Sequence, residues 1–295
     1  MNGVLVLTMG DPDPENYRPE TGIRTVTIEA GGNIEILLAV SDYSHLYSGM
    51  VYPAAFGEPR AVSALLNARL FFRTALCAAA LTVGLLAVMI GFAGRNKTPI
   101  MLYGLLCLLF IGYAGYPITQ TFFSGFQLKY AIENVSFCAM LCVVMLLARR
   151  VCGIKKAYSG SFLAFGGLMC LFAASSSFLW QTGSLRIMMA YSTLVSVFEW
   201  STAGFLTLSA VWGVWNNSVN TRPLLYGILV FDTALIADRL LPLFEPIATG
   251  WFIELASFIM IAALGITVGQ EVAAQYRNAA ILTERTGHME RLFEM

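Results

Sequence analysis

Hydrophobic and polar positions follow two different patterns along this chain. Up to residue 59, short apolar stretches alternate with polar residues and are separated by Pro, Gly, Asp and Asn, which is typical of β-strands joined by turns. A few short strands bury little apolar surface. We therefore expect residues 1–59 to be a small β segment that forms the last strands of a larger β-sandwich. The first residues lack a signal-peptide pattern, and we therefore expect that Met1 is not the natural start. The expected strands are 4–8, 25–29, 34–40 and 50–55.

From Leu70 onward the pattern changes to long apolar runs. Each run is long enough to cross a hydrocarbon core of about 30 Å as a helix. The predicted fold class is therefore membrane all-α, with residues 60–269 forming a seven-transmembrane helix bundle. The predicted spans are roughly 70–92, 100–118, 129–148, 161–180, 187–212, 224–243 and 251–269.

Composition agrees with this pattern. Apolar residues make up 57% of the 295 residues and charged residues only 12%, about half the share of a soluble domain. The mean hydropathy is +0.69. The lipid bilayer is thus the expected environment, and the formal net charge of zero gives no reason to expect a nucleic-acid partner.

Basic residues predict the orientation of the bundle. Loops after the odd-numbered spans contain seven Lys and Arg residues, whereas the loops on the opposite side contain three. The positive-inside rule places the first set in the cytoplasm, so the β segment lies outside and the C-terminus inside. Trp180 and Trp251 fall at outer ends of spans, where aromatic residues gather. The first set is Arg95, Lys97, Arg149, Arg150, Lys155, Lys156 and Arg222, and the second is Lys129, Arg186 and Arg239.

The last predicted span continues without a break into residues 270–295. A heptad frame predicts a leaky apolar seam that is typical of a parallel two-stranded coiled coil. We expect this cytoplasmic signalling helix to pair in a homodimer; the alternative is a frayed amphipathic tail on the membrane surface. The two seam positions hold Val268, Gln275, Leu282 and Met289, and Val272, Ala279, Thr286 and Phe293.

No pattern in the chain predicts catalysis, a cofactor or a metal site. Cys138 and Cys142 lie four residues apart on one helix face, but no His or acid accompanies them at ligand spacing, which favours simple packing. His45 and His288 are predicted on opposite sides of the membrane, so they do not share a site. We therefore expect no enzyme activity from the chain as it stands.

Ionisable residues within the spans are costly unless they face protein or water. Glu199 lies near the middle of the fifth predicted span, and Asp232 and Arg239 lie seven residues apart on the sixth. We predict that these three residues form one intramembrane polar cluster. Two interpretations stay open: a two-state switch or ion-sensing site, and a static packing contact.

Further acids lie where the predicted outer turns meet the β segment. Asp238, Glu245 and Glu254 crowd the turn after the sixth span, and we expect the signal to enter there. Glu133 is one turn after Lys129, a spacing that allows an interfacial ion pair.

Two stretches resemble bacterial seven-transmembrane receptors with diverse intracellular signalling modules. NGVLV, ENYRPE and IEILLAVSDYSHLYSGMVYPAAFG (34–57) resemble the end of that family's outer jelly-roll domain and its junction to the first span, with Asp42, Tyr43, His45 and Gly49 as the junction residues. ADRLLPLFEPIATGWFIE (237–254) resembles the outer turn between its sixth and seventh helices.

The resemblance implies a receptor in the bacterial cytoplasmic membrane. Such a receptor would sense an extracellular small molecule or carbohydrate and relay the signal to a cytoplasmic module, such as a histidine kinase of a two-component system. The chain departs from the family by lacking both the front of the outer domain and any such module. A transporter or channel is the alternative, although the chain shows no internal repeat of the kind that many transporters have.

Overall fold

The computed structural model describes residues 5–11, 13–16, 18, 20, 24–28, 35–40, 56–93, 97–122, 126–179, 185–216, 221–244 and 252–293. Within these ranges the chain forms α-helices and no strand. The helices are α1 (Pro59–Ala93), α2 (Lys97–Ala114), α3 (Tyr116–Phe122), α4 (Phe126–Val151), α5 (Lys156–Leu179), α6 (Leu185–Trp215), α7 (Thr221–Phe244) and α8 (Phe252–Phe293).

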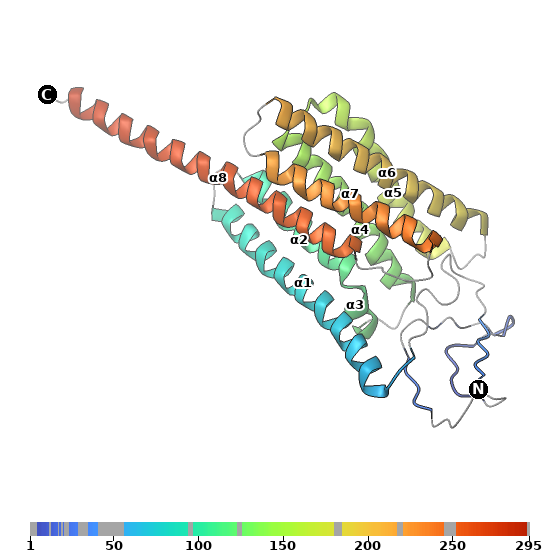
Figure 1. Ribbon diagram of the computed structural model, residues 1–295. Coiled ribbons are helices and arrows are strands. Elements are labelled where there is room, and N and C mark those ends of the chain that lie inside the picture. The colour runs from blue at the N-terminus through green and yellow to red at the C-terminus, as the bar shows by residue number, and fades with distance from the viewer. Residues whose placement is uncertain are drawn as a thin grey trace.

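The long helices lie side by side in one bundle (Figure 1). α1 packs on α2, α2 on α4, α4 on α5, α6 on α7 and α7 on α8, so most neighbours in sequence are neighbours in space. Fully buried side chains such as Phe110, Met140, Leu206 and Leu264 fill the interior. The described part of each predicted apolar run falls on one long helix, except that the second run crosses from α2 into α3.

Among the described residues, five helices are long and apolar enough to cross a membrane, and they lie within α1, α4, α5, α6 and α8. The apolar part of α2, Thr98–Ala114, is shorter. α7 contains Arg222, Asp232, Asp238 and Arg239, which lower its apolar character. Several long apolar helices in one chain indicate a multi-pass membrane protein.

The predicted second span, 100–118, ends earlier than expected. α2 stops at Ala114, and the short helix α3 begins at Tyr116 after the turn residue Gly115. Pro117 explains the break, because proline has no N–H to donate and its ring clashes with the preceding turn of a continuous helix. The apolar run alone did not reveal this interruption.

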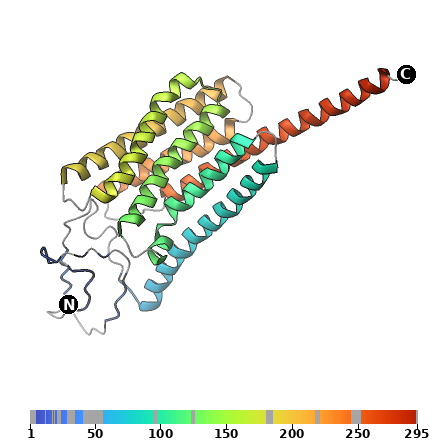
Figure 2. The ribbon, with the colours of Figure 1, turned by 180° about the vertical axis from the view of Figure 1, so that it is seen from behind.

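α8 is a single helix of 42 residues, roughly 63 Å long. It packs along α7 within the bundle and then projects well beyond the other helices (Figures 1 and 2). The predicted boundary at residue 270 is therefore not a structural break. The C-terminal end of α8 and the N-terminal segment lie at opposite ends of the molecule (Figure 2).

The predicted β segment is not confirmed by the described residues between 5 and 40. They contain one isolated antiparallel bridge, in which the N–H groups of Asp11 and Arg18 donate to each other's carbonyl oxygens at 3.0 and 3.1 Å. Alternating apolar residues form a strand only when a neighbouring strand pairs with their backbone. Apolar side chains of the predicted strands are exposed instead, with Leu5 at 82% and Leu37 at 87%.

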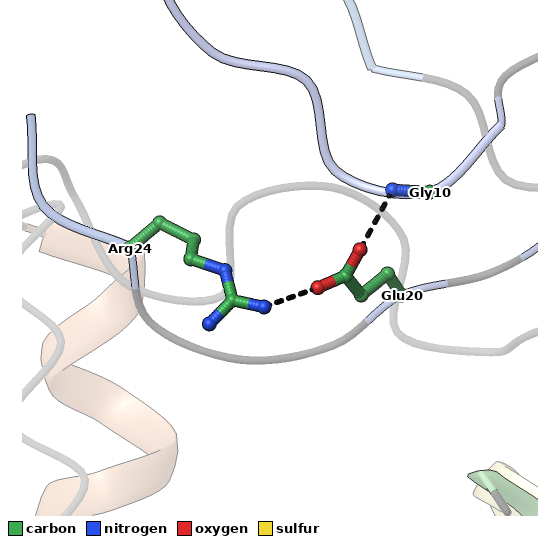
Figure 3. Close-up of polar contacts among 3 residues, drawn as sticks. All are labelled: Gly10, Glu20 and Arg24. Carbon is green, nitrogen blue, oxygen red and sulfur yellow. Dashed lines mark hydrogen bonds and ion pairs between the residues drawn. The ribbon is translucent and has the colours of Figure 1, made fainter. Parts of the chain in front are cut away.

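Glu20 organises the turn around this bridge (Figure 3). The Gly10 N–H donates to its Oε2 at 3.1 Å, and the Arg24 guanidinium contacts its Oε1 at 2.5 Å. Gly10 has a φ of 66°, a conformation that favours glycine. The Gly10 N–H, followed by Arg24, lowers the pKa of Glu20 below its usual value of 4.5.

The Gly10 contact is expected to weaken in acid. Because the folded-state pKa of Glu20 is lowered, the contact stabilises the fold at neutral pH. This stabilisation is lost as the pH falls through that pKa and Glu20 becomes protonated. In the full chain labelled with ¹⁵N-glycine, the Gly10 amide resonance should shift along this titration. The Glu20→Gln variant should show no such shift. A Gly10 titration that persists in Glu20→Gln would contradict the contact.

Candidate functional site

One end of the helix bundle lies toward the N-terminal segment (Figure 1). Charged and polar side chains from α1, α2, α4, α6, α7 and α8 interact near this end. α7 ends and α8 begins at this end. We call this group the polar cluster; its members are Arg73, Tyr113, Glu133, Glu199, Asp238, Arg239 and Glu254.

An ion pair joins the first and last helices of the bundle. Nη2 of Arg73 on α1 lies 2.8 Å from Oε1 of Glu254, in the first turn of α8. The side chains are only 19% and 14% exposed, so the pair is largely shielded from solvent. Shielded pairs with good geometry are costly to break, because removal of one partner leaves an uncompensated charge. This contact fixes the start of α8 against α1.

Asp238 on α7 holds the start of α8 from the other side. The backbone N–H of Ile253 donates to Oδ2 of Asp238 at 3.0 Å. The first N–H groups of a helix have no partner within the helix, and a negative charge near them is favourable. Asp238 therefore acts as a cap supplied by a neighbouring helix. Asp238 thus contacts the first turn of α8, and Glu254 belongs to that turn.

Glu199 on α6 pairs with Arg239 on α7. The Arg239 Nη2 group donates to Oε2 of Glu199, whose side chain is almost buried, while the Arg239 side chain is half exposed. The carboxylate thus lies inside the bundle and the guanidinium reaches it from the edge. The structure brings these two residues of the predicted three-residue cluster together.

Asp232 is separate from that pair. Its Oδ2 accepts a hydrogen bond from the Thr207 hydroxyl on α6, and its buried Oδ1 has no hydrogen-bond partner. Two helical turns separate Asp232 from Arg239 on α7. Asp232 therefore contacts Thr207 on α6, whereas Arg239 contacts Glu199, about two turns away on the same helix. The prediction of one three-residue cluster was therefore wrong about Asp232. The α6–α7 interface has two polar contacts at different depths.

Tyr113 on α2 is within electrostatic range of several charged members of the polar cluster. Its phenol group interacts electrostatically with Glu133, Glu199, Glu254 and Arg73, which come from four other helices. Its ring packs on Phe137, with centroids 5.0 Å apart. A phenol can donate to one carboxylate while accepting from another group, so Tyr113 is suited to linking charges on different helices.

Glu133 belongs to this group and not with Lys129. The structure records no ion pair between these two described side chains, and Lys129 is buried. Glu133 instead interacts electrostatically with Arg73 and Glu254. Helical spacing alone allowed the pair with Lys129, whereas Glu133 lies within electrostatic range of Arg73 on α1 and Glu254 on α8.

The sequence interpretation missed Arg73 and Tyr113. Arg73 lies only three residues into the first predicted span, and an arginine within an apolar run is a usable signal for a buried partner. Tyr113 has no comparable signal, because a tyrosine near the end of an apolar helix is common at membrane interfaces.

Some predicted site residues lie outside the described residues. These are the junction residues Asp42, Tyr43, His45 and Gly49, and Glu245 of the outer turn. The polar cluster above therefore rests on the described helices alone.

A second ion pair holds α8 at the opposite end of the bundle. Nη2 of Arg150 on α4 lies 3.1 Å from Oε1 of Glu271 on α8, and the Gln275 side chain donates to the same oxygen at 3.2 Å. Arg149 donates to the hydroxyl of Ser159 on α5 at 3.2 Å. α8 is thus linked by ion pairs to α1 near one end of the bundle and to α4 near the other.

The polar cluster is suited to holding helices together through charge. It contains four acids and two arginines, so its balance of charge depends on protonation and on neighbouring groups. In the part of the chain that the structure describes, no group of three or more His, Cys, Asp or Glu side chains is arranged to hold a metal ion. Comparison of the chain with protein-family models, with curated proteins and with solved structures found no match.

Proposed function

We propose that this chain is the sensing and transmitting part of a transmembrane receptor. The observation that carries the proposal is the course of α8. This single helix starts in the polar cluster, runs along α7 through the bundle and continues far beyond it (Figure 1). A rigid helix with one end in a network of charges can transmit a small displacement to its other end.

The two ion pairs of α8 support a membrane-spanning path. Glu254 and Glu271 are separated by 17 residues, about 26 Å along the helix axis. This distance is close to the thickness of a hydrocarbon core, about 30 Å. Each pair would then lie near one membrane interface, and the part of α8 after Glu271 would lie in water.

We propose that seven helices cross the membrane: α1, α2, α4, α5, α6, α7 and α8. α7 contains four charged residues, but Asp232, Asp238 and Arg239 all have partners on α6 or α8. Polar groups satisfied within the bundle reduce the cost of placing α7 in lipid. The seven-to-three distribution of basic residues favours an outer N-terminal segment and a cytoplasmic C-terminus.

The resemblance to bacterial seven-transmembrane receptors adds the remaining parts of the proposal. The location is then the bacterial cytoplasmic membrane, with residues 1–59 outside as the end of a jelly-roll domain. A small molecule or carbohydrate would be sensed outside, and the end of α8 would lead into or contact a cytoplasmic signalling module such as a histidine kinase. The polar cluster lies at the start of α8, so it is the proposed point of signal entry.

A transporter or channel is the alternative function. Two cavities within the described residues have no charged side chain in their linings. Transporters commonly bind substrate near the middle of the membrane with polar groups and broken helices. No specific observation therefore favours a transporter over a receptor.

The part of α8 beyond the bundle is expected to pair with its twin in a parallel homodimer. Position 282 belongs to the predicted apolar seam, whereas position 284 does not. In a chain without its native cysteines, Leu282→Cys should form an intermolecular disulfide faster than Glu284→Cys. The measurement is oxidative cross-linking in membranes, followed by non-reducing electrophoresis.

A second arm tests transmission along α8. Glu254→Gln, which removes the carboxylate paired with Arg73, should change the cross-linking rate at Leu282→Cys if α8 relays changes from the polar cluster. Asn278→Ser, on an exposed part of the same helix, serves as the matched control and should leave the rate unchanged. Equal cross-linking at positions 282 and 284 contradicts the homodimer, and a rate at 282 unaffected by Glu254→Gln contradicts the relay.

A further inference from the structure

Two thiols from different helices meet in an open apolar groove. Cys142 on α4 and Cys170 on α5 line the same groove, and their thiols are near enough to interact directly. Both line a groove of about 600 Å³, whose other walls are apolar side chains of α2, α4 and α5. Leu105 and Leu109 form the α2 side of this groove, and neither thiol is fully buried.

Gly166 permits this approach of α4 to α5. A Cβ atom at Gly166 would lie 2.3 Å from the Cys142 sulfur, closer than any side chain tolerates. Cys170 follows Gly166 by one helical turn, so the two residues share one face of α5. The missing side chain at Gly166 lets the Cys142 sulfur lie against α5 within reach of the Cys170 thiol.

A third thiol is close, but the three do not form a metal site. Cys138 is fully buried one turn before Cys142 and interacts electrostatically with Cys170. The described residues contain no group of three or more His, Cys, Asp or Glu arranged to hold a metal ion. Thiol chemistry at the groove therefore involves the two thiols that line it, Cys142 and Cys170.

The position of the thiols limits which reagents reach them. Cys170 lies 14 residues, about 21 Å, after the start of α5, and Cys142 lies nine residues, about 14 Å, before the end of α4. Both are therefore deep within helices that have the length and apolar character of membrane spans. An oxidant that reaches them must dissolve in lipid.

We propose that Cys142 and Cys170 form a redox pair that closes to a disulfide between α4 and α5 when a lipid-soluble quinone enters the groove. Two S–H bonds break and one S–S bond forms. The pair gives two electrons and two protons to the quinone, which leaves as the hydroquinone. The proposal is independent of the receptor function, because it rests on the groove and the two thiols.

The test uses the full chain, reduced and placed in lipid nanodiscs. Decylubiquinone is the probe, because its fully substituted ring accepts electrons without retaining a thiol as an adduct. After exposure, free thiols are blocked with N-ethylmaleimide, and intact and peptide masses are measured. The expected result is the loss of two alkylated thiols per chain and a linked peptide pair that contains Cys142 and Cys170, with an equal amount of hydroquinone formed.

Single variants identify the pair. Cys142→Ser and Cys170→Ser should each keep all of their remaining thiols free, whereas the matched control Cys138→Ser should lose two thiols as the unmodified chain does. Full alkylation of all six cysteines in the unmodified chain after exposure to the quinone would overturn the proposal. A disulfide that includes Cys138 in place of Cys142 would overturn it as well.

Discussion

Replacement of Arg73 by Gln is expected to lower the free energy of unfolding by about 3 kcal/mol, which is the scale for removing one partner of a buried ion pair. The change leaves the Glu254 carboxylate in a largely shielded site without its guanidinium. The double variant Arg73→Gln/Glu254→Gln should recover much of the loss, because neither charge then remains uncompensated. The measurement is reversible unfolding in mixed micelles of a mild detergent and SDS.

A second double-mutant cycle provides the control. Asp232 and Arg239 lie two turns apart on α7 and have different partners, Thr207 and Glu199. The effects of Asp232→Asn and Arg239→Gln should therefore add within about 0.5 kcal/mol, as expected for separated sites. Additive effects for Arg73 and Glu254 would show that their ion pair contributes nothing to stability, and the account of the polar cluster would then be wrong.

The helices of the bundle could be predicted because each apolar run is long enough to be recognised as a membrane-spanning helix. The runs at 129–148 and 187–212, for example, fall within α4 and α6. The break between α2 and α3 was missed, since Tyr113 to Ile118 stays mostly apolar although Pro117 prevents a continuous helix. Strands before residue 59 were predicted from alternation, but alternation does not supply the pairing partner that a strand requires.

The polar contacts could be predicted only in part. Glu199 and Arg239 stand out in sequence because a charge inside an apolar run demands a partner. Which residue becomes the partner depends on the rotation of each helix about its axis and on the alignment of neighbouring helices. The spacing of residues along one helix determines neither. For this reason Asp232 was assigned to Arg239 although it accepts a hydrogen bond from Thr207. Glu133 was assigned to Lys129 although it lies within electrostatic range of Arg73 and Glu254.

The orientation of the chain in the membrane is the second prediction with a large effect, because its outcome is all or none. Alkaline phosphatase is active only after export, so a fusion after Gln181 should be active and a fusion after Arg95 inactive. The reason is the excess of Lys and Arg, including Arg95, Arg149, Arg150 and Arg222, on the predicted cytoplasmic side of the spans. Green fluorescent protein, which becomes fluorescent in the cytoplasm, serves as the reciprocal reporter at the same positions.

The central claim is that α8 carries a signal from an outer segment to a cytoplasmic end, and this topology scan tests it most directly. The account predicts phosphatase activity after Gln181 and fluorescence both after Arg95 and after the end of α8. Phosphatase activity after Arg95 with none after Gln181 would place the N-terminal segment inside the cell and contradict the receptor.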